Sequence, residues 1–184
     1  PPRDLFRTDR WTWADALYMS PPTMSLLEQA TGDDRYLRFV ETEFRRTYDH
    51  LFDPAERLFY RDETYIGQRT PNGEKVFWSR GNAWVYAGLA LLLDNVDVAE
   101  PGWPFYYSLY QQMSPAVLAA QQPDGHWYTS LKDPAHGPGG ETSGGWTSCG
   151  PMRGSSWRAC GPPLRPLPRR QRATKASPRP RPSG

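Results

Sequence analysis

One carboxylate stands among aromatic side chains near the start of the chain, in the segment RWTWADALYMSPP. Asp15 follows two tryptophans, Trp11 and Trp13, and precedes an apolar stretch. Apolar neighbours desolvate a carboxylate and raise its pKa, so that it can hold a proton near neutral pH, as a general acid must. The residues alone leave a second interpretation open and favour it: Asp15 caps a helix beside aromatic residues of the core.

A cation and an aromatic ring stand four residues apart in FWSRGNAW, residues 77–84. We expect Arg80 to lie in a loop that turns at Gly81 and brings it near Trp84. Arginine offers a bidentate fork to a carboxylate, and tryptophan offers a flat face to a sugar ring. The alternative is that Arg80 pairs with a structural aspartate while Trp84 fills the core.

A glycine-rich loop, GGETSGG at residues 139–145, carries Thr142 and Ser143. Such a loop can bring hydroxyl groups and backbone N–H groups close to a ligand. Glycine-rich loops are common, so this pattern by itself predicts little.

Metal and nucleotide chemistry are disfavoured. The three histidines, His50, His126 and His136, lack the spacing of metal ligands. The chain contains no GxSxG elbow, P-loop or dinucleotide-binding fingerprint. We therefore expect no bound metal and no cofactor.

Helices are expected to position these residues. A short helix is predicted over residues 24–30, begun near Pro22 and ended by Gly32. Asp33 or Asp34 can cap the next helix, whose apolar residues recur at intervals of three and four. That apolar stripe consists of Leu37, Val40, Phe44, Tyr48 and Leu51.

Two further helices follow later in the chain. Residues 83–93 are apolar almost all round, which predicts a helix buried on most sides with Asn82 as its N-cap. The last predicted helix ends at the sequence QQPDG, and its apolar stripe consists of Tyr106, Leu109, Met113, Val117 and Ala120.

The segment between the second and third helices, residues 57–78, alternates aromatic and polar residues around Pro71, Asn72 and Gly73. This pattern predicts a short β-hairpin. Helices in pairs, with long aromatic-rich loops on one side, indicate an all-α array or toroid of helical hairpins.

Charge divides the chain into two parts. Residues 150–184 hold nine basic residues, eight prolines and no acidic residue, whereas the preceding residues have a net charge of −7 (13 Lys and Arg against 20 Asp and Glu). We expect a folded domain over residues 1–145 and a disordered tail over residues 146–184. The tail composition is typical of a GC-rich gene read out of frame. A solvated extension and a basic arm for nucleic acid are the alternatives.

Other classes of protein are disfavoured by composition. No cysteine precedes Cys149, so a disulfide framework is excluded, and a cysteine-based zinc site is not expected. No apolar run approaches the roughly 20 residues that span a membrane, and no signal peptide is visible in the first residues.

Five ordered motifs resemble the unsaturated glucuronyl and rhamnogalacturonyl hydrolases, glycoside hydrolase families 88 and 105. They are WTWADALYMSPPTMSLLEQATGDDRYL, LFYRDETY, KVFWSRGNAWVYAGLALLL, QQPDGHWYTSLKDP and ETSG, within residues 4–144. The resemblance implies a six-hairpin (α/α)6 toroid, without cofactor, that acts on oligosaccharides left by polysaccharide lyases. It also implies a cytoplasmic enzyme that binds neither nucleic acid nor membrane.

The resemblance also implies roles for particular residues. Asp15 matches the aspartate that protonates C4 of the unsaturated uronic acid and then activates water to attack C5. Trp13 and Trp84 would pack on the sugar, and Arg80 would bind the uronate or nearby hydroxyls. Family members often carry a histidine after the LFY motif, where this chain has Arg61, so Arg61 is expected to hold the carboxylate instead.

The favoured substrate is unsaturated galacturonyl-rhamnose from rhamnogalacturonan. We expect an incomplete toroid, because family helices before Asp15 and after residue 145 have no counterpart here. Two rivals remain: another α-toroid sugar enzyme of the epimerase kind, which would need catalytic histidines on facing helices, and a non-enzymatic protein with a nucleic-acid-binding tail.

Overall fold

The computed structural model describes residues 11–137 and 139–141. Within them the chain forms mainly helices and one two-stranded antiparallel sheet. The elements are α1 (Ala16–Met19), α2 (Pro21–Thr31), α3 (Arg35–Leu51), β1 (Phe52–Asp53), β2 (Leu58–Phe59), the 3-10 turn η2 (Glu63–Tyr65), α4 (Ser79–Asn95) and α5 (Trp103–Ala119). Predictions for residues 146–184 lie outside the described residues.

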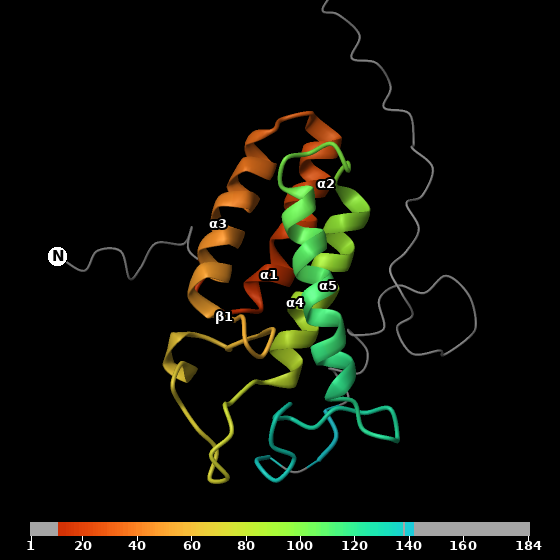
Figure 1. Ribbon diagram of the computed structural model, residues 1–184. Coiled ribbons are helices and arrows are strands. Elements are labelled where there is room, and N and C mark those ends of the chain that lie inside the picture. Colours follow the sequence, from red (N-terminus) through yellow and green to blue (C-terminus); the bar gives the residue numbers. More distant parts are fainter. Residues whose placement is uncertain (1–10, 138, 142–184) are drawn as a thin grey trace, which may run out of the picture.

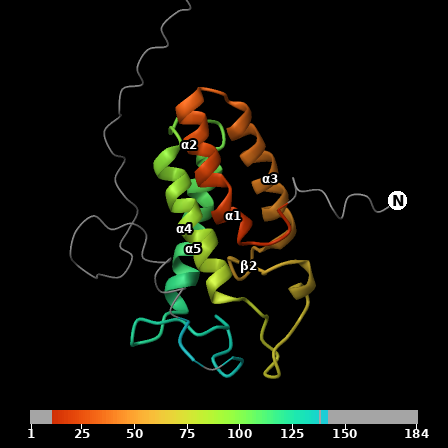
Figure 2. The same ribbon diagram turned by 180° about the vertical axis from the view of Figure 1, so that it is seen from behind.

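Two helical hairpins lie side by side, α2 with α3 and α4 with α5 (Figure 1). Short connections join the helices of each hairpin at one end. The longer segments 52–78 and 120–137 gather at the opposite end, as the view from behind also shows (Figure 2). The fold therefore collects its long loops on one side, as the sequence predicted.

The predicted helices form close to their expected positions. Proline opens α2, and Gly32 ends it in the left-handed conformation at φ 70°, which glycine adopts without steric cost. The predicted stripe of α3 is confirmed, since Val40, Phe44 and Leu51 are fully buried in the core. In α5 the predicted positions from Tyr106 to Val117 are buried as well.

The main core is rich in aromatic contacts. The ring of Phe44 lies 5.2 Å from that of Tyr106, edge to face, and Tyr86 stacks on Tyr110 at 4.5 Å. Such pairs contribute about 0.5–1.5 kcal/mol beyond the area they bury. They join α3 to α5 and α4 to α5, so the two hairpins share one core.

A second, smaller core lies under the long loops. It is centred on Phe77 and Trp127, with Leu58, Tyr60, Val117 and Leu131 around them. The indole N–H of Trp127 donates to the carbonyl of Val117 at 2.7 Å, which fixes the 120–137 segment to the end of α5. The loops are therefore anchored by their own buried side chains.

Three local predictions need correction. Asn82 is not the N-cap of α4, and Arg80 does not lie in a loop that turns at Gly81, because the helix begins at Ser79 and includes Arg80 and Gly81 in its first turn. The side-chain amide of Asn82 instead bonds both the N–H and the carbonyl of Phe59, at 2.8 and 2.9 Å, and so ties α4 to β2. A long-range contact of this kind has no signature in the local sequence.

A short β-hairpin is present, but it is formed by β1 and β2, which precede the predicted Pro71-Asn72-Gly73 turn rather than flank it. Phe52 pairs with Phe59 and Asp53 with Leu58. The Pro71-Asn72-Gly73 signal does produce a turn, closed by a single antiparallel bridge between Arg69 and Lys75.

One glycine sets the distance between α1 and α4. A Cβ atom at Gly88 would lie 2.4 Å from the carbonyl oxygen of Leu17 and 2.9 Å from the Cα of Tyr18. Both obstacles are backbone atoms, which cannot rotate away. Gly88 therefore allows α4 to pack directly on the backbone of α1.

Gly88→Ala is expected to lower the free energy of unfolding by about 1–3 kcal/mol, because overpacking of this size forces helices apart. The measurement is chemical denaturation followed by circular dichroism. Gly140→Ala is the matched control, since its added Cβ would meet His126 at an ordinary 3.7 Å, and its effect should stay within about 0.5 kcal/mol. Equal stability of the two variants would contradict the packing described here.

Candidate active site

Asp15 occupies the position before α1, and its neighbour Ala14 is hydrogen-bonded to Arg61 in the long 52–78 segment. Its side chain forms no capping hydrogen bond with the helix. One carboxylate oxygen, Oδ1, is buried and has no hydrogen-bond partner within the described part of the chain. Burial raises the pKa of Asp15 above its ordinary value. The desolvation expected from the sequence is present, and the capping role of the side chain is not.

The first turn of α4 lies against this carboxylate. A Cβ atom at Gly81 would lie 3.6 Å from Oδ1 of Asp15 and only 3.0 Å from the ring of Trp78. The carboxylate of Asp15 therefore lies within van der Waals reach of the helix at Gly81, and a side chain there would crowd the ring of Trp78 rather than Asp15. Packing at Gly88, two turns further along α4, holds α1 in the matching position.

Arg80 is the strongest electrostatic influence on Asp15. Its positive charge lowers the pKa of Asp15 and partly opposes the larger effect of burial. The guanidinium lies over the ring of Trp78, with 4.4 Å between Cζ and the ring centroid, and approaches Glu141 at 4.0 Å. The ring that supports Arg80 is thus that of Trp78, two residues before it, and no signal in the sequence identifies this contact.

Arg61 is the second cation whose charge lowers the pKa of Asp15. Backbone contacts bring it there: the N–H of Ala14 donates to the carbonyl of Arg61 at 2.9 Å, and Trp13 forms an antiparallel bridge with Asp62. The guanidinium lies over the ring of Trp13, with 4.7 Å between Cζ and the ring centroid. Trp13, Asp15, Arg61 and Arg80 are therefore gathered around one place.

Trp84 lies one turn after Arg80 in α4, and its ring packs against Tyr18 of α1, with 4.5 Å between the ring centroids. It is partly exposed, whereas Trp13 has 47% of its surface accessible. Trp13 can therefore offer a sugar a broad face. Thr142 and Ser143 lie outside the described residues.

No group of three or more His, Cys, Asp or Glu side chains in residues 11–137 and 139–141 is arranged to hold a metal ion. His50 lies on the surface, where its Nε2 is 3.1 Å from Glu63. No helix in the same residues is long and apolar enough to cross a membrane.

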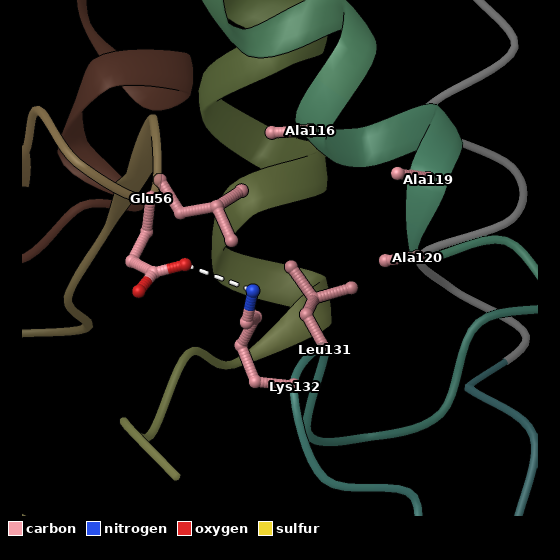
Figure 3. A pocket seen from close by; sticks show the side chains of 7 residues that line it. Glu56, Ala116, Ala119, Ala120, Leu131 and Lys132 are labelled. Carbon is pink, nitrogen blue, oxygen red and sulfur yellow. Dashed lines mark ion pairs between the residues drawn. The ribbon is translucent and has the colours of Figure 1, made fainter.

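A separate pocket lies between the end of α5, the turn before β2 and the 131–132 segment (Figure 3). Its lining is mostly alanine and leucine, and its two charged groups, Glu56 and Lys132, pair with each other at 2.8 Å. Asp15 and the two arginines are not among its lining residues. The one acid that lines this pocket, Glu56, has a pKa lowered by its hydrogen bond with Lys132, whereas that of Asp15 is raised, so we place the candidate site at Asp15.

Comparison with known proteins gives the family. The pattern of glycosyl hydrolase family 88 matches residues 6–152, so this chain belongs to that family. A glycosyl hydrolase family 88 structure from Bacteroides vulgatus is 37% identical and superposes with a TM-score of 0.72 over 76% of this chain. Solved relatives from families 88 and 105 are (α/α)6 toroids, so the two hairpins described here are part of such a toroid.

Two curated relatives carry the same name, unsaturated 3S-rhamnoglycuronyl hydrolase. The protein from Alteromonas sp. (strain LOR) is 38% identical over 68% of this chain, and that from Formosa agariphila is 40% identical over 75% of it. The chain spans only 30% and 38% of their lengths, and 40% of the Bacteroides structure.

Asp15→Asn is expected to stabilise the fold at neutral pH. Because the pKa of Asp15 is higher in the folded state than in the unfolded state, folding becomes less favourable as the pH rises from the unfolded pKa through the folded pKa. The gain should disappear below about pH 4, where both states are protonated. Chemical denaturation at several pH values measures it.

Asp133→Asn is the matched control with the opposite sign. Hydrogen bonds from Thr70 and Asn72 lower the pKa of Asp133, so that this substitution should destabilise the fold at neutral pH. A destabilising effect of Asp15→Asn at neutral pH would contradict the desolvation of Asp15.

Arg80→Gln is expected to raise the pKa of Asp15 further, because it removes the main charge that opposes burial. The carboxyl carbon of Asp15, followed by NMR through a pH titration, measures this. Arg69→Gln removes an equal charge that is not among the influences on Asp15, and it should leave the titration unchanged. Equal titration curves for Arg80→Gln and the unmodified protein would show that Arg80 does not act on Asp15.

Proposed function

We propose that this chain carries the acid-bearing part of a glycoside hydrolase that hydrates the C4=C5 double bond of a terminal unsaturated uronic acid. The observation that carries the proposal is the buried Oδ1 of Asp15, whose pKa is raised while two arginines stand close enough to act on it. Membership of family 88 and the names of the two curated relatives support the same reaction.

The reaction needs one carboxyl group that both gives and takes a proton. Protonated Asp15 donates its proton to C4, and the electrons of the double bond form the new C–H bond, leaving a positive charge shared between C5 and the ring oxygen. Asp15, now ionised, accepts a proton from the water that attacks C5. The hemiketal opens to a C5 ketone, and the hemiacetal left at C1 releases the second sugar. One water is consumed, and Asp15 regains its proton.

The other residues bind and orient the sugar in this proposal. The exposed face of Trp13 and the partly exposed ring of Trp84 pack on the sugar rings. Arg80 and Arg61 supply positive charge for the uronate carboxylate. No cofactor takes part, because the steps need only water and a carboxyl proton. Thr142 and Ser143 remain candidates for contact with substrate hydroxyls.

Rhamnose is the second sugar that we propose. The sequence motifs favour unsaturated galacturonyl-rhamnose, and the curated relatives' names also join rhamnose to a uronyl group. Both point to rhamnose next to the unsaturated residue, and the relatives' names specify no particular uronic acid. A cytoplasmic location, inferred from the resemblance to the family, is part of the same proposal.

Asp15→Asn is expected to abolish turnover while leaving binding of the disaccharide largely intact, because the amide cannot deliver a proton yet keeps the shape of the side chain. The ultraviolet absorbance of the C4=C5 bond falls as the substrate is hydrated, and this loss is the measurement. Unmodified chain and Asp15→Asn are compared on unsaturated uronyl-rhamnose, with binding followed by calorimetry.

Asp94→Asn is the control, because Asp94 lies near the far end of α4 from Arg80, and it should turn over substrate like the unmodified chain. Undiminished turnover by Asp15→Asn would remove Asp15 from the mechanism. A product that keeps its double bond would overturn the proposed reaction.

A further inference from the structure

Arg61 is held more firmly than a surface arginine usually is. Its Nε donates to Oδ2 of Asp62 at 2.7 Å, and only 30% of its side chain is exposed. The guanidinium also lies over two aromatic rings: Cζ is 4.7 Å from the ring centroid of Trp13 and 4.2 Å from that of Tyr65. Three contacts therefore fix the plane of this one cation.

Asp62 is itself fixed in place. It is buried, with 6% of its surface exposed, and its Oδ1 accepts hydrogen bonds from the backbone N–H and the hydroxyl of Thr64. These bonds and Arg61 lower the pKa of Asp62, so the carboxylate stays charged at neutral pH, although burial acts in the opposite direction. Its backbone also pairs with that of Trp13. Asp62 therefore joins the segment before α1 to the guanidinium of Arg61.

The contacts of Arg61 with Asp62, Trp13 and Tyr65 involve the Nε edge and the flat faces of its guanidinium. In the described part of the chain neither terminal nitrogen of Arg61 has a hydrogen-bond acceptor, since the bond to Asp62 is made by Nε. Two parallel N–H groups on a fixed plane match the two oxygens of a carboxylate or a sulfate ester. The charge of Arg61 also reaches Asp15, so the fork lies in the neighbourhood of the acid.

We infer that Arg61 is a preorganised oxyanion fork that selects charged sugars beside Asp15, and that Asp62 and Tyr65 are positioning residues that hold the fork in its plane. The inference rests on the proposed function, because it takes the ligand to be the unsaturated oligosaccharide. It adds that Asp62 and Tyr65 preorganise Arg61, and that Arg61 distinguishes charged from uncharged sugars by a bidentate contact with an oxyanion. The oxyanion is either the uronate carboxylate or a sulfate ester on the second sugar.

The test is calorimetric binding of three unsaturated disaccharides to the 184-residue chain: one plain, one with a sulfate ester on the second sugar, and one with the uronate reduced to an alcohol. Arg61→Gln should weaken binding of the ligand with the recognised oxyanion about ten- to a hundredfold. If Arg61→Gln loses affinity for the plain ligand but not for the reduced one, the fork binds the carboxylate. If it loses affinity only for the sulfated ligand, the fork binds the sulfate ester.

Asp62→Asn should weaken binding of the same ligand by about tenfold. The double variant with Arg61→Gln should bind no more weakly than Arg61→Gln alone, because the two substitutions disrupt the same interaction. Arg61→Lys keeps the charge but not the fork, and should also lose affinity. Arg61→Lys therefore still tests the fork if Asp62→Asn fails to fold. Arg69→Gln is the control for loss of one charge on an exposed loop, and should bind like the unmodified chain.

Two results would overturn the inference. Equal affinities of Arg61→Gln and the unmodified chain for all three ligands would show that the fork is not used, while Asp15→Asn could still abolish turnover and leave the proposed function standing. Binding of none of the ligands by the unmodified chain would contradict the fork and the proposed function together.

Discussion

The packing of α4 on the backbone of α1 is the constraint on which the rest of the structure depends. It exists only because residue 88 has no side chain, since a Cβ atom there would lie 2.4 Å from the carbonyl oxygen of Leu17. The residue before α1 is Asp15, and the first turn of α4 holds Arg80 and Gly81. The contact that joins the two helices in the core therefore also sets the carboxylate beside the cation.

The candidate site balances two opposing effects on one carboxyl group. Burial raises the pKa of Asp15, and the charges of Arg80 and Arg61 lower it, with burial the larger effect. The arginines are useful only if they attract an anionic sugar without ionising the acid. Their pairing with Glu141 and Asp62 weakens their pull on Asp15. An oxyanion bound between them would weaken it further and would favour the protonated acid at the moment it is needed.

The sequence predicted those features that repeat or stand close together along the chain. The apolar stripes of α3 and α5 and the end of α2 at Gly32 are predictable, because helical periodicity and the residues that end a helix are local features of the sequence. Asp15 could be picked out because aromatic residues surround it in sequence. The sequence does not reveal the role of Asn82, because its partner, Phe59, is 23 residues away. The sequence does not mark Trp78 and Tyr65 as partners of Arg80 and Arg61, although each ring lies within four residues of its arginine, because nothing in one sequence says which ring a guanidinium will contact.

The central claim is that the fold keeps a proton on Asp15 at a pH where an ordinary aspartate has lost it. The measurement that tests it most directly is the pKa of Asp15 in the unmodified chain, from the chemical shift of its carboxyl carbon through a pH titration. The structure predicts a pKa above the ordinary value of about 3.9 for aspartate. A pKa at or below that value would mean that the arginines outweigh burial, and Asp15 could not serve as the acid.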